Sequence, residues 1–200
     1  MEMQKFRIGS DNFSYMFIEG KNALIIDPGM DPEEVLEFIE SRDLTLRYIV
    51  ATHHHGDHTM SVPEIARKTG ARVVTSDYCA GRIGGADMIV HEGDEIEFGD
   101  SYFRIISTPG HTPGGICLLA DDLYLLTGDT LFIDDCGRCD LPDSSLEKMF
   151  ESLQKLKSLP DALQVLPGHD YGRIPTDSLG NQKKTNPTLL AKNLSEFSRM

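Results

Sequence analysis

The 200-residue sequence predicts one domain of the α/β class, spanning residues 1–200. Three observations favour this class. Short apolar runs alternate with amphipathic segments over the first 75 residues, as strands alternate with helices in α/β proteins. The second half adds a series of short apolar runs and one strongly periodic segment. The composition, 40% hydrophobic and 26% charged, is that of an ordinary globular protein, and no short-period repeat or low-complexity tract divides the chain.

Nine strands are predicted from short apolar runs bounded by turn residues. The first two runs are joined by Glu19-Gly20-Lys21-Asn22, a Gly-containing turn that indicates a hairpin. Gly-Asp and Asp-Asp pairs separate the strands of the second half. The predicted strands are residues 15–18, 23–26, 48–51, 72–75, 95–98, 102–107, 116–119, 123–126 and 164–166.

Four helical segments are predicted between and after these strands. In the helix over 61–69, Ser61 is expected to cap the first turn, Pro63 suits that turn, and Gly70 ends the helix. The segment 144–159 has the clearest period, because its apolar residues recur at helical spacing and form one buried stripe. That stripe consists of Leu146, Met149, Phe150, Leu153 and Leu156. The other two helices begin at Pro32 and cover the tail from 186 to 197.

Charge and hydropathy exclude several classes of partner. A formal net charge of −13 disfavours nucleic acid, because binding to phosphates relies mainly on Lys and Arg. The first twenty residues contain no apolar core of a secretory signal, and no apolar run approaches the ~18 residues of a membrane span. We therefore expect a cytoplasmic protein that binds neither nucleic acid nor membrane. Its oligomeric state is left open, and a homo-oligomer is one of the alternatives.

Four cysteines are expected to remain unbridged, because a cytoplasmic protein rarely builds a disulfide framework. Cys136-Gly-Arg-Cys139 has the C-x-x-C spacing of redox and zinc sites. A single C-x-x-C motif without a second pair of cysteines is a weak signal. We therefore interpret both residues as free thiols in a turn and leave their role open.

Four polar clusters follow directly after predicted strands. Strand ends that converge on one rim are where sheet proteins commonly build sites. The clusters are THHHGDHT after residue 51, TPGH after 107, TGD after 126 and PGH after 166. They contain five of the seven histidines, namely His53, His55, His58, His111 and His169. His54 is expected to point away from its neighbours, and His91 to lie on the surface.

The stretch THHHGDHT has the residue types of a metal site presented by a loop. His53 and His55 are two residues apart in an extended segment, so their imidazoles point to the same side. Asp57 and His58 come next, and Gly56 allows a tight turn. Imidazole and carboxylate are ligands that zinc and iron accept. A solvated surface loop is the alternative for this stretch alone, but the other three clusters favour the metal site.

In chain order, these clusters resemble the metallo-β-lactamase superfamily. The similarity covers nearly the whole chain, from IIDPG at 25–29 to KTNPTL at 184–189. It implies an αββα four-layer sandwich, with two β-sheets face to face, helices outside and a metal site at one edge. The motifs are H-x-H-x-D-H at 53–58, His111 in TPGHTPGG, Asp129 in TGDTLF and His169 in PGHDYG.

The resemblance also implies two divalent metal ions, with zinc expected first and iron or manganese as alternatives. Two cations about 3.5–4 Å apart lower the pKa of a shared water from ~15.7 towards ~7. Asp57 is then expected to be catalytic by orienting the nucleophile. One ion would take His53, His55 and His111, the second would take Asp57, His58 and His169, and Asp129 would bridge them.

Two branches of the superfamily fit the motifs. DNFSYMF, THHHGDH and GDTLF resemble hydroxyacylglutathione hydrolases, or glyoxalase II enzymes. CGRCD and HDYG resemble persulfide dioxygenases, which use one iron at the positions of His53, His111 and Asp129. We predict a hydrolase of small thioester or acyl compounds that acts by attack of a metal-bridged hydroxide. The alternative is an iron-dependent dioxygenase acting on a thiol persulfide. A metal-binding protein without catalysis is disfavoured, because structural zinc sites are closed.

The resemblance places Arg138 and Tyr171 near the bound thiol compound. Arg138 is expected to bind a carboxylate through both nitrogens of its fork, and a structural salt bridge is the alternative. Tyr171 is expected to donate a hydrogen bond to the thiol compound. Lys183 and Lys184 are weaker candidates for the same role in binding it. About thirty residues follow His169, so we expect the helical domain with which glyoxalase II holds glutathione to be absent. The identity of the thiol therefore stays open.

Overall fold

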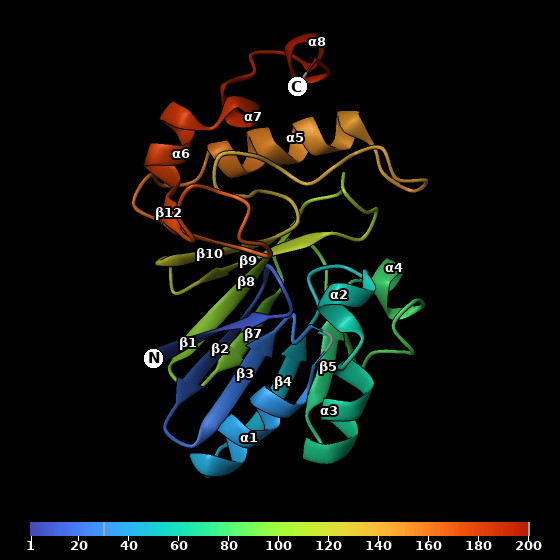
Figure 1. The fold of residues 1–200 in the computed structure, drawn as a ribbon, viewed down its shortest axis with the longest axis vertical. Helices are drawn as coiled ribbons and strands as arrows, with labels where there is room; N and C mark the ends of the chain where they lie inside the picture. The colour runs from blue at the N-terminus through green and yellow to red at the C-terminus, as the bar shows by residue number, and fades with distance from the viewer. Residues whose placement is uncertain (30, 200) are drawn as a thin grey trace.

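Two six-stranded β-sheets pack face to face in the computed structural model, which describes residues 1–29 and 31–199 (Figure 1). The helices lie on the outer faces of the two sheets, so the predicted αββα sandwich is confirmed. The strand order is β1-β2-β3-β4-β5-β6 in the first sheet and β12-β11-β10-β9-β8-β7 in the second.

The first sheet joins an antiparallel meander to a parallel part. Strands β1, β2 and β3 pair antiparallel, and β3 to β6 run parallel because helices connect them. Its strands are β1 (Glu2–Ile8), β2 (Asn12–Glu19), β3 (Asn22–Ile26), β4 (Thr45–Val50), β5 (Arg72–Thr75) and β6 (Met88–Ile89). The helices of this half are α1 (Glu33–Ser41), α2 (Gly56–Thr59), α3 (Val62–Thr69) and α4 (Asp77–Ala80).

The second sheet is antiparallel except where β11 runs parallel to β10 after the crossover through α5. Its strands are β7 (Glu95–Phe98), β8 (Ser101–Ser107), β9 (Ile116–Ala120), β10 (Tyr124–Gly128), β11 (Gln164–Pro167) and β12 (Asp177–Ser178). The helices are α5 (Leu146–Lys157), α6 (Leu179–Thr185), α7 (Pro187–Leu190) and α8 (Leu194–Phe197). Within the described ranges, no helix has the length and apolar character needed to cross a bilayer.

Three apolar layers hold the sandwich together. Phe17 and Phe103 meet between the two sheets, with ring centroids 5.0 Å apart. The outer face of the first sheet is covered by α1 and α3 through residues such as Val35 and Ile65. The outer face of the second sheet is covered by α5, whose predicted stripe is buried at Met149, Leu153 and Leu156 and partly buried at Leu146 and Phe150. Burial of these side chains is the main stabilising contribution to the fold.

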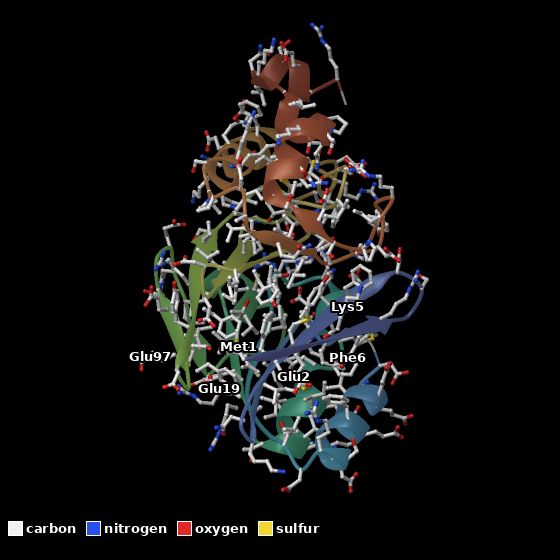
Figure 2. All side chains as sticks on the ribbon, turned by 90° about the vertical axis from the view of Figure 1, so that its left-hand side faces the viewer. Met1, Glu2, Lys5, Phe6, Glu19 and Glu97 are labelled. Atoms are coloured by element: carbon white, nitrogen blue, oxygen red, sulfur yellow. The ribbon has the colours of Figure 1, made fainter. Side chains whose placement is uncertain are left out.

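Each of the nine predicted strands overlaps one observed strand, but β1 and the two-residue strands β6 and β12 were not predicted. The sequence of β1 mixes exposed and buried positions, because β1 is the edge of the first sheet. Figure 2 shows this edge, where Phe6 packs towards α1 and the Lys5 ammonium lies 4.3 Å from the centroid of the Phe13 ring. A single apolar run therefore does not mark the strand.

Two helix predictions need correction. The tail over 186–197 is not one helix but the two short helices α7 and α8, because Asn193 starts a new helix by accepting a hydrogen bond from the Glu196 amide. Ser61 stands at the N-cap position just before α3, but its hydroxyl donates to the Gly29 carbonyl oxygen at 2.7 Å and makes no capping hydrogen bond to the helix. Gly70 does end α3, in the left-handed conformation.

Candidate metal centre

The four polar clusters meet at one edge of the sandwich. The clusters after β4, β8, β10 and β11 are brought together by backbone hydrogen bonds between their segments. The Ile116 amide donates to the Thr52 carbonyl across the two sheets at 2.9 Å, and the Gly168 amide donates to the Gly128 carbonyl at 2.9 Å. Segments separated by more than 100 residues therefore share one rim.

One group of ligand atoms comes from His53, His55 and His111, whose ring nitrogens lie within 4.8 Å of one another. The His111 Nε2 atom is 2.9 Å from His55 Nδ1. Asp129 adjoins this group, with its Oδ2 atom 3.5 Å from His111 Nε2 and 3.9 Å from His53 Nε2.

A second group comes from Asp57, His58 and His169, again within 4.8 Å of one another. The His58 and His169 Nε2 atoms are 3.1 Å apart. Asp57 Oδ2 lies 3.5 Å from His58 Nε2 and 3.4 Å from His169 Nε2. Asp129 also adjoins this group, at 3.2 Å from His58 and 3.4 Å from His169. Asp129 thus lies between both groups.

The chemistry of these donors fits metal ions. Buried polar atoms normally have a hydrogen-bond partner, yet the buried Nε2 atom of His53 has none among the described residues. The two groups and Asp129 also bring five imidazoles and two carboxylates together, which is unfavourable unless cations or protons lie between them. The cluster is therefore able to bind metal ions.

Glycine at position 168 allows this convergence. A Cβ atom there would lie 2.6 Å from Asp129 Oδ1 and 2.8 Å from His58 Cε1, closer than side-chain carbons approach other atoms. The chain after β11 can run beside the two ligands only because residue 168 has no side chain. The PGH motif thus supplies both a ligand, His169, and the room that the ligand cluster needs.

Asp27 also lies against the cluster, although nothing in the sequence assigned it a role in the site. Asp27, His53 and His58 form a third group with metal-ligand spacing. The Asp27 carboxylate, however, already accepts hydrogen bonds from the Thr52 amide at 2.7 Å and the Thr52 hydroxyl at 2.6 Å. Its Oδ2 atom lies 3.2 Å from His58 Nδ1, opposite the Nε2 atom that faces the cluster. We therefore interpret Asp27 as the residue that orients the His58 ring.

The substitution Asp27→Asn is expected to weaken metal binding at the group that contains His58. An amide NH₂ would face the Thr52 hydroxyl and the His58 Nδ1–H group, which both donate to Asp27. Loss of such a partner typically costs 10–100-fold in metal affinity. Competition titrations with a metal-binding dye would measure the effect for each ion. An unchanged second affinity would contradict the positioning role of Asp27.

Asn12 is a further residue that contacts the cluster and that the sequence analysis did not single out. Its side-chain amide donates to Asp57 Oδ2 at 3.1 Å and to the Asp57 carbonyl at 3.3 Å. The two residues are 45 positions apart, so no local pattern links them. Asn12 stands in the DNFSYMF motif, which was the available signal.

The two remaining histidines are not part of either group. His54 packs its ring against Tyr78, with centroids 5.6 Å apart, and also contacts the His55 ring. His91 is exposed and lies 3.5 Å from Asp94. The four cysteines are free, and burial raises the pKa of Cys136 to about 12 and that of Cys139 to about 11. These two thiols are therefore protonated near neutral pH.

The predicted substrate residues Arg138 and Tyr171 both adjoin the cluster. The Tyr171 ring stacks on the His169 ring, with centroids 4.6 Å apart and planes 7° apart, and 57% of Tyr171 is exposed. The Arg138 carbonyl accepts a hydrogen bond from His111 Nδ1 at 2.8 Å, which leaves His111 Nε2 facing the cluster. The Arg138 guanidinium forms a fork-shaped ion pair with Asp140.

The two lysine candidates lie on α6. The Lys183 ammonium donates to the Leu159 carbonyl and to Asp161, so it is engaged within the protein. Lys184 is exposed.

The two groups differ in their affinity for protons. Burial lowers the pKa of His53 well below its usual value and that of His55 to about 4. Burial also disfavours protonated His58 and His169, but the charge of Asp129 and hydrogen bonds to carboxylates outweigh it. The pKa of His58 is raised well above its usual value, and that of His169 is raised to about 9. At neutral pH the metal-free protein holds a proton at the His58–His169 pair.

Metal binding should therefore depend more steeply on pH at the Asp57–His58–His169 group than at the other group. A metal there must displace protons from histidines whose pKa is raised, so its affinity should rise at least about tenfold per pH unit as the pH rises towards 9. His53 and His55 are already neutral at these pH values. The proton on His169 also stabilises the folded metal-free protein fully below about pH 6.5, and that contribution is lost as pH rises through 9. Calorimetric titrations in buffers of different ionisation enthalpy would count the protons. Equal proton release for both ions would contradict this assignment.

The sequence of the chain is similar to those of known proteins. Residues 8–169 match the family described as the metallo-beta-lactamase superfamily. The hydroxyacylglutathione hydrolase of Rhodospirillum rubrum is 39% identical over 175 residues, which are 86% of this chain and 67% of that protein. The chain thus spans about two thirds of the length of this relative.

Solved structures are similar over nearly the full chain. The crystal structure of ETHE1 from Myxococcus xanthus has a TM-score of 0.90 and 32% identity, and covers 98% of this chain and 88% of that one. The di-iron-bound form of TTHA1623 has a TM-score of 0.76 and 28% identity, and covers 94% of this chain and 99% of that one.

Proposed function

The chain belongs to the metallo-β-lactamase superfamily, and from this premise we propose that it is a hydrolase of small thioester or acyl compounds that uses two divalent metal ions. One observation carries the proposal: both ligand groups are complete and meet at Asp129. We propose zinc as the metal, with iron or manganese as alternatives, since all three accept imidazole and carboxylate ligands. The relatedness to hydroxyacylglutathione hydrolases supports the thioester as substrate.

In this proposal, His53, His55 and His111 would hold one ion, Asp57, His58 and His169 would hold the other, and Asp129, which lies between the two groups, would serve both. When bound, the ions lower the pKa of a shared water and polarise the carbonyl group of the substrate. The di-iron-bound form of TTHA1623 supports a pair of ions, since it is a structural neighbour of this chain.

The surrounding residues have definite roles in the proposed reaction. Asp57 is half-buried and held by Asn12, so its carboxylate is fixed where it can orient the attacking water. Tyr171 presents an exposed ring beside the cluster, and burial of its hydroxyl raises its pKa to about 12. The phenol therefore stays protonated and donates a hydrogen bond to the substrate. A thiolate is a good leaving group and needs little help from a general acid.

A persulfide dioxygenase is the second candidate, because the CGRCD and HDYG motifs resemble those of such enzymes. The similarity to the ETHE1 structure, with the highest TM-score quoted above, also fits this alternative. In that case His53, His111 and Asp129 would hold one iron. The substrate in either case is a small thiol-derived molecule. The net charge of −13 supports our proposal that the protein has no nucleic-acid partner.

Parallel assays on one preparation separate the two candidates. We expect the purified protein to hold about two metal ions per chain and to cleave at least one of two thioesters of a 2-hydroxy acid, one with glutathione and one with N-acetylcysteamine. We expect no oxygen consumption when glutathione persulfide is added. One iron per chain, oxygen uptake with the persulfide and no cleavage of either thioester would overturn the proposal in favour of the dioxygenase.

A further inference from the structure

We propose that Asp140 occupies Arg138 and thereby makes the site select thioesters whose thiol part carries no carboxylate. This inference rests on the proposed thioester hydrolysis and names the class of thiol that the site accepts. It differs from the expectation that Arg138 binds a substrate carboxylate.

Arg138 stands at the rim of the metal centre. Its carbonyl oxygen accepts the hydrogen bond from His111 Nδ1 at 2.8 Å. The preceding residue, Gly137, is buried, and a Cβ atom placed there would lie 3.2 Å from His111 Cβ. The backbone of residues 137–138 is therefore fixed against a candidate metal ligand, and the Arg138 side chain starts from this fixed point. Of this side chain, 65% is exposed.

The Arg138 guanidinium is engaged by a carboxylate of the same loop. Its Nε atom donates to Asp140 Oδ1 at 2.6 Å, and its Nη2 atom donates to Asp140 Oδ2 at 2.8 Å. This is the two-bond fork with which arginine binds a free carboxylate. Asp140 is only two residues away, so the pair forms without ordering distant segments. Asp140 therefore occupies two of the five donors of Arg138 and offsets its charge, so a substrate carboxylate meets a partly occupied and neutralised guanidinium.

A second arginine near the cluster is also paired internally. The guanidinium of Arg173, two residues after Tyr171, lies 2.8 Å from Asp134 and 3.8 Å from Asp177. Asp11 lies 4.0 Å from His169 and adds negative charge to the rim. An anionic thiol group is thus met by carboxylates, whereas an uncharged thiol such as an N-acylated cysteamine is not repelled.

A matched pair of substrates tests this selectivity. S-acetyl-N-acetylcysteine and its methyl ester differ by a single carboxylate, and both carry the same thioester bond. With the metal-loaded enzyme we expect kcat/KM to be at least threefold higher for the methyl ester. Asp140→Asn should raise the ratio of acid to methyl ester in kcat/KM about three- to tenfold, mainly through a lower KM for the acid, because an exposed ion pair has a modest energy. Adding Arg138→Gln to that variant should remove the gain.

Asp143→Asn is the matched control. Asp143 is exposed, lies three residues further along, and accepts a hydrogen bond from the Tyr78 hydroxyl at 3.0 Å. The substitution removes the same charge without freeing Arg138, so the ratio should stay within twofold of wild type. If Asp140→Asn and Asp143→Asn shifted the ratio equally, net charge alone would explain the effect, and the proposal would be overturned. A wild-type preference for the acid would also overturn it.

The outcomes separate this inference from the proposed function. If the metal-loaded enzyme cleaves neither substrate nor the glutathione thioester, the proposed function fails. If it cleaves both substrates and the ratio does not respond to Asp140→Asn, only the role of Asp140 fails.

Discussion

Replacement of Asp129 by alanine should empty both metal positions. Asp129 is 9% exposed and lies within 3.9 Å of ligand atoms from His53, His58, His111 and His169. Among the described residues, Asp57 adjoins only one group, and Asp27, which adjoins His53 and His58, is already bound by Thr52 and faces His58 Nδ1. We expect the metal content to fall from about two ions to fewer than about 0.5 per chain. Thioester hydrolysis should fall at least ~1000-fold, equivalent to about 4 kcal/mol of transition-state stabilisation.

Metal analysis after gel filtration and a kcat/KM measurement check this expectation. Asp129→Asn keeps the volume of the side chain, so it distinguishes loss of the bridging charge from a packing defect. Asp143→Ala, on the exposed side of the same region, should keep both ions. Full metal content in both Asp129 variants would show that Asp129 is not the bridge.

The second large effect is expected from Gly137→Ala, a change of one methyl group outside the ligand set. A Cβ atom at this position would overlap the carbonyl oxygen of Asp129 and press on His111 Cβ. Both obstacles belong to residues that the centre needs, and a backbone oxygen cannot rotate away. We expect a loss of about 3 kcal/mol in the free energy of unfolding, in the range of an overpacked core, together with weaker metal binding. Denaturant unfolding of the metal-free protein measures the first quantity.

Gly81→Ala provides the matched control for this substitution. Gly81 has an ordinary helical conformation, with φ −64°, and a Cβ atom there meets no atom within 4 Å. Its variant should unfold within about 0.5 kcal/mol of wild type. If Gly137→Ala were equally mild and kept its metal, the tight contact between residue 137 and Asp129 would have no part in building the centre.

The convergence of the candidate ligands was predictable because these residues follow strand ends. The run of His53 and His55 leaves an apolar strand, and His111 and His169 each follow a Pro-Gly pair after other strands. In a sandwich of this kind such ends meet at one edge. The α/β class followed from the same apolar runs, since strands such as β4, β9 and β10 contain consecutive buried positions.

The parts that were missed depend on contacts between distant residues. Asp27 orients His58, and Asn12 holds Asp57, across 31 and 45 positions respectively. Both are ordinary polar residues in sequence, and only the folded chain gives them a role. Strand β1 was missed for a related reason, since an edge strand keeps polar residues on its open side. The division of the tail into α7 and α8 depends on the hydrogen bond to Asn193, which no apolar period reveals.

Anomalous diffraction at the metal absorption edge of the purified, metal-loaded protein tests the account most directly. It predicts two peaks about 3.5–4 Å apart, with Asp129 between them, His53, His55 and His111 around one, and Asp57, His58 and His169 around the other. A single peak, or peaks that leave one of the two groups without metal, would contradict a two-metal hydrolase.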